Sequence, residues 1–223
     1  MKKIRALISD LDGTALNSGK KGFLRLGILA ERNGIDFTEE VQMRLRENWG
    51  LSPVELIMIG FSVNREVAED VYNQWVHLDK LDPIPLVEGV EEMLRQNVEK
   101  GIINFIFTSR HTKSACDVLK RFNIIHLFKD VVGVEGGLIV SASEFRKPDP
   151  RSLNNLLQFI HERHGISKDE IVYVGDEIFD IQCGMGAGLL TFGVTSGLKT
   201  KEELITAGAP EQNVFPTLAH IIF

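Results

Sequence analysis

Short apolar runs alternate with longer amphipathic stretches along most of this chain. Each run is bounded by polar or turn-forming residues, as expected for strands buried in a parallel sheet. The predicted strands are residues 4–9, 103–108, 130–134, 171–175 and 190–194. The predicted helices are residues 88–100, 112–122, 150–164, 179–187 and 201–208. This alternation is typical of an α/β fold with a doubly wound parallel sheet.

The segment from about residue 20 to residue 80 differs, because it shows helical patterns only. The first helix is expected to end at Asn33-Gly34. Amphipathic helices bury their apolar faces against one another, so a small helical bundle is predicted here. The capping residues expected to open the later helices are Thr38, Ser52 and Asn64.

Composition limits both the architecture and the function. The chain has 223 residues, of which 43% are hydrophobic, which suits a core domain of residues 1–16 and 84–223 with a helical domain of residues 17–83 inserted. A net charge of −6 without a basic cluster argues against nucleic-acid binding. No apolar run reaches the ~18 residues that span a membrane. Cys116 and Cys183 are expected to be buried thiols, in a cytoplasmic protein that is a monomer or a weak homodimer.

Two acids follow the first predicted strand directly. Asp10 and Asp12 stand one residue apart, and Gly13 then lets the backbone turn sharply. Ligands of parallel α/β sheets bind at the carboxyl ends of the strands. There, one carboxylate can attack an electrophile or hold a metal while the other transfers a proton. The alternative is an acidic turn, because Asp-Gly is a common turn dipeptide.

A similar arrangement recurs after the predicted strand at residues 171–175. Gly175-Asp176 ends this strand, and Asp180 follows at the start of a predicted helix. Oxygen ligands from separate strand ends suit Mg²⁺. Asp176 could instead be a helix N-cap, and Asp180 could orient the ligands or pair with a cation rather than bind the metal itself.

Two smaller signals lie between these acids. Thr108 and Ser109 end a predicted strand with hydroxyls that could hold a phosphate oxygen. Lys147 lies on a segment stiffened by Pro148 and Pro150. Hydroxyls after a strand are also common in turns, and a single lysine is usually a solvated charge.

Taken in order, these segments resemble the sequence motifs of the haloacid dehalogenase (HAD) superfamily. The resemblance extends over nearly the whole chain and implies a HAD-like Rossmannoid core. The matching segments are Asp10-x-Asp12-Gly13-Thr14, Thr108, Lys147-Pro148, and Gly175-Asp176 with Asp180.

The resemblance also implies a role for each site residue. Asp10 would attack phosphorus to form an aspartyl-phosphate, and Asp12 would protonate the leaving oxygen and later deprotonate water. Thr108 would bind a phosphoryl oxygen, and Lys147 would neutralise charge. Mg²⁺ would be held by Asp10, Asp176 and the backbone carbonyl of Asp12. The cations are needed because several carboxylates would otherwise repel a phosphate dianion.

Asp12 decides among branches of this superfamily. The dehalogenases and the phosphonate-cleaving members lack an acid at this position, whereas the phosphatases and phosphomutases carry one. The helical segment enters directly after Asp12-Gly13-Thr14, where the resemblance implies a helical cap that favours small substrates. We therefore expect a phosphatase of a small phosphorylated metabolite, phosphoglycolate-like on resemblance. The alternatives are a β-phosphoglucomutase-type mutase and a catalytically silent binding protein.

The helical segment contains its own candidate substrate contacts. Arg46 to Gly50 is similar to an Arg-x-x-x-Gly stretch in the caps of phosphoglycolate phosphatase-like members. Arg46 and Trp49 could thus contact the leaving group, or Trp49 could be bundle core and Arg46 a solvated charge. Arg110 and His111, which follow Ser109, are further candidates for substrate contact.

Overall fold

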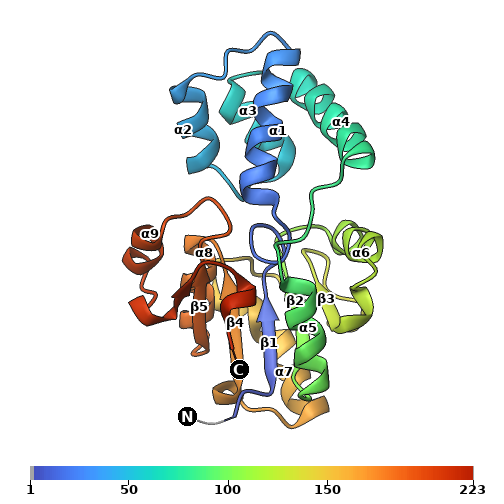
Figure 1. The fold of residues 1–223 in the computed structure, drawn as a ribbon, viewed down its shortest axis with the longest axis vertical. Helices are drawn as coiled ribbons and strands as arrows, with labels where there is room; N and C mark the ends of the chain where they lie inside the picture. Colours follow the sequence, from blue (N-terminus) through green and yellow to red (C-terminus); the bar gives the residue numbers. More distant parts are fainter. Residues whose placement is uncertain (1–2, 223) are drawn as a thin grey trace. The chain divides into compact units, whose positions relative to one another are not determined.

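The structure is a computed structural model that describes residues 3–222. The chain forms two compact units, one from the segments up to Asn17 and from Leu86 onward, the other from Ser18–Pro85. The first unit is an α/β core, and the second is made of helices (Figure 1). This architecture confirms the predicted fold class.

The core contains a parallel sheet of six strands in the order β3-β2-β1-β4-β5-β6. The chain runs outward from β1 to one edge and then resumes on the other side of β1 at β4. The carboxyl ends of β1 and β4 therefore form the topological switch point, where ligands bind in such sheets. The strands are β1 (Ala6–Ser9), β2 (Ile103–Phe107), β3 (Phe128–Val132), β4 (Ile171–Gly175), β5 (Leu190–Val194) and β6 (Val214–Phe215).

Three strands differ from the sequence prediction by at least two residues. β1 begins at Ala6 rather than at residue 4. β3 begins two residues before the predicted start at residue 130, because exposed Lys129 interrupts the apolar run of this edge strand. The two-residue strand β6 was not predicted, since it is too short to show a periodic pattern.

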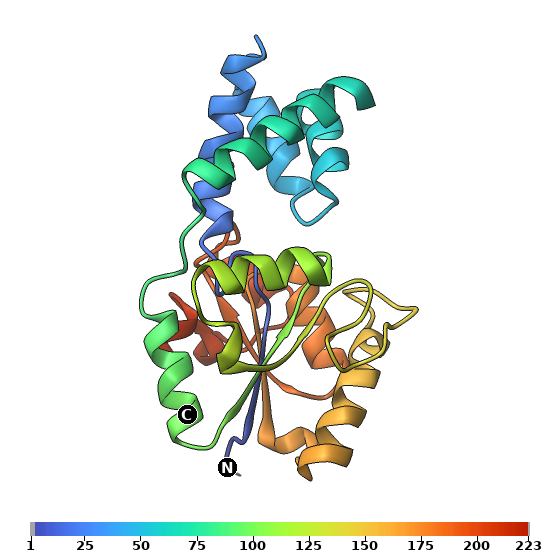
Figure 2. The same cartoon turned by 90° about the vertical axis from the view of Figure 1, so that its right-hand side faces the viewer.

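Helices cover both faces of the sheet, as Figure 2 shows for α5 and α7. On one face, α7 and α8 pack against side chains of the central strands, including the fully buried Ile8, Phe105 and Tyr173. Burial of this apolar area is the main stabilising contribution to the core. The core helices are α5 (Val90–Glu99), α6 (Thr112–Arg121), α7 (Asn154–His164), α8 (Ile178–Gly186) and α9 (Lys201–Thr206).

The helical unit consists of α1 (Ser18–Arg32), α2 (Glu39–Glu47), α3 (Pro53–Phe61) and α4 (Arg65–Leu81). The predicted helix starts are confirmed. The side chain of Thr38 accepts a hydrogen bond from the Val41 amide, and that of Asn64 accepts one from Val67. Pro53 occupies the first turn of α3, where its missing N–H costs nothing.

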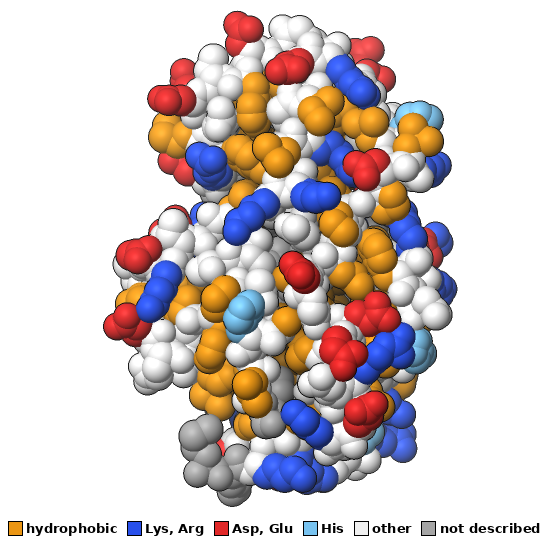
Figure 3. Space-filling model, in the orientation of Figure 1, with side chains coloured by type: hydrophobic (Ala, Val, Ile, Leu, Met, Phe, Trp, Pro, Cys, Tyr) orange, Lys and Arg blue, Asp and Glu red, His pale blue; other side chains and the backbone are white. Residues whose placement is uncertain are grey.

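None of the helices in residues 3–222 is both long and apolar enough to cross a membrane. On the face drawn in Figure 3, the Lys and Arg side chains are interspersed with acidic and apolar ones. That face therefore has a mixed rather than a basic character.

The contact between α2 and α3 yields a test of the helical unit. A Cβ added at Gly60 would lie 2.2 Å from Cδ2 of Leu45, and Leu45 is fully buried. We expect Gly60→Ala to destabilise this unit by roughly 1–3 kcal/mol. Urea unfolding followed by tryptophan fluorescence measures this unit alone, because Trp49 and Trp75 are the only tryptophans in the chain and both lie within it.

The control is the same substitution in a Leu45→Ala background. Removing the Leu45 side chain relieves the clash, so Gly60→Ala should then cost less than half as much free energy. Equal losses in the two backgrounds would contradict the proposed contact.

Candidate active site

The acids predicted at the ends of β1 and β4 lie together in the core. Asp10 follows β1, and its amide donates to the carbonyl of Val174 in β4 at 2.8 Å. Asp10 and Asp176 are buried. Carboxylate oxygens of Asp10, Asp176 and Asp180 lie within 4.8 Å of one another. The parallel pairing of β1 with β4 thus brings three acids to one point.

Lys147 joins two of these acids. Its Nζ donates to Oδ1 of Asp10 at 2.6 Å and to Oδ1 of Asp180 at 2.7 Å. Its side chain is only 2% exposed and lies beside the ring of Phe107, 5.1 Å from the ring centroid. Burial disfavours the ammonium charge, but the charges of Asp10 and Asp180 outweigh it and raise the pKa of Lys147. The lysine is therefore charged and fixed in place.

Asp180 is the hub of a second set of contacts. It accepts hydrogen bonds from Lys147, from the hydroxyl of Tyr173 at 2.8 Å, and from the amide of Glu177 at 3.2 Å. It thus both pairs with a cation and forms the capping box of α8 with Glu177. The N-cap of α8 is Glu177, so the alternative that Asp176 caps this helix is wrong.

Tyr173 is a site residue that the sequence reasoning missed. Its side chain is fully buried in β4, and a tyrosine within an apolar strand looks like an ordinary core residue. The available signal was its hydroxyl, because a buried hydroxyl needs a partner.

Asp176 is held in a tight backbone cradle. Oδ1 accepts from the hydroxyl of Thr14 at 2.9 Å, whereas Oδ2 is buried without a hydrogen-bond partner. A Cβ at Gly13 would lie 2.1 Å from that oxygen, and one at Gly197 would lie 1.8 Å from it. Both glycines are therefore needed for the close approach of Asp176.

These residues fit a bound Mg²⁺. Burying a carboxylate oxygen without a hydrogen-bond partner costs free energy. A hard cation bound by Asp10 and Asp176 would supply the missing partner of Oδ2 of Asp176. Such an ion would also offset the mutual repulsion of the acids.

Burial and repulsion perturb the acids strongly. Desolvation, together with the charges of Asp180 and Asp12, raises the pKa of Asp10 to about 7, although Lys147 opposes this shift. Burial followed by repulsion from Asp10 and Asp180 raises the pKa of Asp176 as well. Burial also raises the pKa of Glu177 to about 8, against the opposing charge of Lys199. Lys147 and Lys199 oppose the shifts of Asp10 and Glu177 without cancelling the effect of burial.

Asp12 is paired with a residue from another segment. Nε of Arg110 donates to Oδ2 of Asp12 at 2.9 Å, and Nη2 donates to Oδ1 at 2.5 Å. Each side chain is 30% exposed. The structure thus brings Arg110 to the predicted proton donor. His111 instead contacts Glu135 and is exposed.

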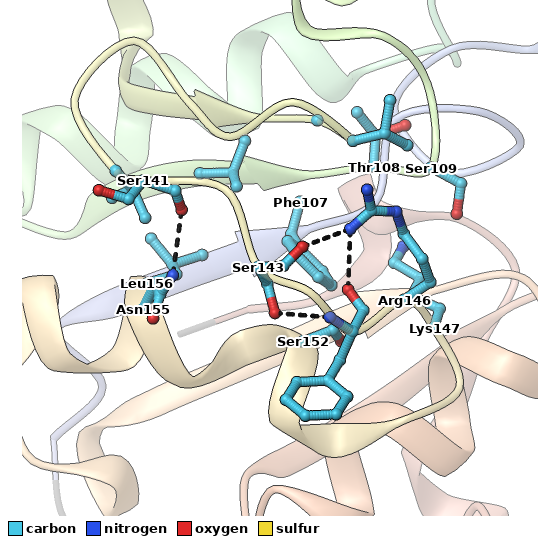
Figure 4. Close-up of a pocket in the computed structure, with 15 residues that line it drawn as sticks. Phe107, Thr108, Ser109, Ser141, Ser143, Arg146, Lys147, Ser152, Asn155 and Leu156 are labelled. Atoms are coloured by element: carbon cyan, nitrogen blue, oxygen red, sulfur yellow. Dashed lines mark hydrogen bonds between the residues drawn. The ribbon is translucent and has the colours of Figure 1, made fainter.

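Thr108 and Ser109 follow β2, which lies next to β1 in the sheet. Thr108 is buried, and its amide donates to Val132 at 2.9 Å. Both residues line a cavity of about 20 Å³ together with Lys147 (Figure 4). This volume holds about one water molecule rather than a metabolite. The other residues that line the cavity are Phe107, Val132, Gly133, Val134, Val140, Ser141, Ser143, Phe145, Arg146, Ser152, Asn155 and Leu156.

Arg46 and Trp49 pack within the helical unit. The guanidinium of Arg46 lies 4.7 Å from the ring centroid of Phe23, and the ring of Trp49 lies 6.3 Å from the same ring. Arg46 is exposed and Trp49 is half-buried. These contacts support a packing role, and a role in substrate contact stays a prediction.

Comparisons with known proteins bear out the resemblance. The family model of the haloacid dehalogenase-like hydrolases matches residues 7–194. A phosphoglycolate phosphatase from Vibrio cholerae is 29% identical over 218 residues, covering 93% of this chain and 91% of that protein. The pyrophosphatase PpaX from Listeria monocytogenes is 25% identical over 208 residues, covering 91% and 88%. The crystal structure of a predicted phosphoglycolate phosphatase from Haemophilus somnus matches with a TM-score of 0.75 at 20% identity, covering 98% and 96%.

The raised pKa of Asp10 predicts how pH affects stability without metal. Its folded-state pKa of about 7 lies above the ordinary 3.8. The folded state therefore holds this proton more tightly, and the resulting stabilisation is lost as pH rises from about 4 to about 7. Asp10→Asn removes the titrating group, so the variant should gain stability relative to wild type at about pH 8, on the order of 1–3 kcal/mol. The gain should be smaller at about pH 5.

Urea unfolding in chelator, followed by circular dichroism, measures this difference at both pH values. Asp117→Asn is the matched control, since this aspartate is exposed on α6 and its substitution should give no comparable gain. A stability difference for Asp10→Asn that does not change with pH would show that Asp10 is not the destabilising group.

Proposed function

The chain belongs to the haloacid dehalogenase-like hydrolases, and on this basis we propose that it is a Mg²⁺-dependent phosphomonoesterase. It acts on a small phosphorylated metabolite through an aspartyl-phosphate. The observation that carries this proposal is Lys147, a buried cation that bridges Asp10 and Asp180 beside Asp176. Such an arrangement fixes a carboxylate for attack within a site prepared for anions.

In the first step, a carboxylate oxygen of Asp10 attacks phosphorus. The phosphorus–oxygen bond of the ester breaks, and the leaving oxygen takes a proton from Asp12. Lys147 holds the attacking carboxylate through Oδ1, which reduces the orientational freedom lost on reaching the transition state. Thr108 and Ser109, at the end of the neighbouring strand β2, supply hydroxyls for the phosphoryl oxygens.

In the second step, water attacks phosphorus and Asp12 accepts its proton. The bond from phosphorus to Asp10 breaks, which releases phosphate and restores the carboxylate. When bound by Asp10, Asp176 and the backbone carbonyl of Asp12, Mg²⁺ supplies positive charge that stabilises the phosphoryl group. Asp180 acts through Lys147, which it holds in place at 2.7 Å.

The substrate we favour is phosphoglycolate or a close analogue. The Vibrio cholerae relative bears this name, and it matches over more than nine tenths of both chains.

A panel of phosphorylated metabolites tests the proposal through the release of inorganic phosphate. We expect phosphoglycolate to be among the best substrates and Asp10→Asn to lower kcat by roughly 10³-fold or more, because the nucleophile is removed. Asp117→Asn serves as the matched control with normal turnover. Near-normal release by Asp10→Asn would contradict the covalent mechanism, and an isomerised sugar phosphate without free phosphate would indicate a mutase.

Removal of the metal provides an independent test. Excess chelator should abolish phosphate release, and Mg²⁺ should restore it. Ca²⁺ should support it poorly, because its longer bonds and higher coordination number do not hold nucleophile and phosphate in line. Mg²⁺ should also raise the Tm of wild type, since it binds the folded state.

The Tm increase separates metal binding from catalysis. In Asp176→Asn it should be largely lost, because one charged ligand is removed. Full activity in chelator, or an equal Tm increase in this variant, would contradict the proposed metal site.

A further inference from the structure

The ion pair between Arg110 and Asp12 engages the carboxylate of the proposed proton donor. The guanidinium donates to both carboxylate oxygens of Asp12, at 2.9 and 2.5 Å. To protonate a leaving oxygen, Asp12 must present one of these oxygens to the substrate. Opening of the pair would free one of these oxygens completely for the substrate.

The backbone of Arg110 is fixed while its guanidinium reaches the solvent. Its amide donates to the hydroxyl of Thr108 at 3.1 Å, and its carbonyl accepts from Val134 at 3.1 Å. A Cβ at Gly133 would lie 2.4 Å from this carbonyl oxygen, so the backbone is closely packed. The side chain, in contrast, is 30% exposed, and it can change partner without moving its own backbone.

A partly exposed ion pair is readily exchanged. Water already solvates both partners in part, so little free energy is lost when one anion replaces another on the guanidinium. Carboxylate and phosphate groups match the two N–H groups that now bind Asp12. The natural competitor is therefore an anionic group on the substrate.

We propose that an anionic group on the leaving group replaces Asp12 on Arg110, and that this exchange frees Asp12 to act as the proton donor. This inference rests on the proposed function. Asp12 must reach the ester oxygen while Arg110, which now touches Asp12, holds the new anion. The anion must then lie within a few bonds of the ester oxygen, as a carboxylate or a second phosphate does.

The exchange couples recognition to reactivity. A substrate without the anion leaves Arg110 on Asp12, so its proton transfer is impaired even when the phosphoryl group is bound. The preference for substrates with the anion should then appear in kcat as well as in KM, since the missing contact is needed for the chemical step. Arg110 contacts the substrate directly and is also the positioning residue for Asp12.

Three substrates and three variants test this proposal. The substrates are phosphoglycolate, with a carboxylate on the leaving group, pyrophosphate, whose leaving group is a phosphate, and 2-hydroxyethyl phosphate, whose leaving group is neutral. The variants are Arg110→Gln, Arg110→Lys and the control Arg95→Gln. Arg95 pairs with Glu91 within α5 at 2.7 Å, so the control breaks an ion pair away from the site.

Wild type should prefer at least one anionic leaving group over the neutral one. Arg110→Gln should lower kcat/KM for that substrate by roughly 10- to 100-fold, and for 2-hydroxyethyl phosphate much less. Arg110→Lys should lie between wild type and Arg110→Gln, because it keeps the charge but not the two-pronged geometry. Loss confined to phosphoglycolate identifies a carboxylate as the ligand, and loss confined to pyrophosphate identifies a phosphate.

Equal losses on all three substrates would overturn the proposal, because Arg110 would then act only through the placement of Asp12. No loss on any substrate would overturn it as well. Absence of phosphate release by wild type from a broad panel would overturn the proposed function and this inference with it. Activity on the panel with equal losses would overturn this inference alone.

Discussion

The bridge from Lys147 to Asp10 and Asp180 is the interaction on which the rest of the site depends. Two carboxylates and an ammonium, all nearly excluded from solvent, are stable together only if each charge has a partner. This requirement links a loop residue, Lys147, to the ends of β1 and the start of α8. The strand order, with β1 beside β4, is what makes such a bridge possible, because it places Asp10 and Asp180 at the same end of neighbouring strands. The pairing of β1 with β4 therefore determines both the strand order and the position of the acids.

Close approach of backbone to carboxylate is the second constraint. A side chain at Gly13 or Gly197 would overlap Asp176, and one at Gly175 would overlap Asp180, with a would-be Cβ 2.3 Å from that residue. These glycines are therefore part of the acid cluster, even though they carry no functional group. Gly13 also has a φ of +79°, a conformation that other residues adopt only at a cost. The shape of the site therefore depends on glycine at these three positions as well as on the acidic side chains.

The sequence was most informative where chemistry coincided with strand ends. Asp10, Thr108 and Asp176 each follow a periodic apolar run, and parallel topology then brings them together. Two kinds of information were not available from the pattern. Tyr173 looks like a core residue in the sequence, because only the folded chain brings Oδ1 of Asp180 within hydrogen-bond distance of its hydroxyl. The pairing of Arg110 with Asp12 depends on side-chain rotamers and on the packing of Gly133 against the Arg110 carbonyl, which no local pattern encodes.

The balance of charge around this cluster supports the proposed metal site. Five acids occur near the carboxyl ends of β1 and β4, namely Asp10, Asp12, Asp176, Glu177 and Asp180. Among residues 3–222, three cations pair with these acids: Lys147 binds Asp10 and Asp180, Arg110 binds Asp12, and Nζ of Lys199 lies 3.9 Å from Oε2 of Glu177. With all eight of these groups ionised, two negative charges remain within this set, which is the charge that one divalent cation offsets. Burial is the largest cause of the raised pKa values of Asp10 and Glu177, and repulsion from the neighbouring acids adds to it. Asp10 and Asp176 are both proposed metal ligands and carboxylates with raised pKa values, so protons and metal compete for these two side chains.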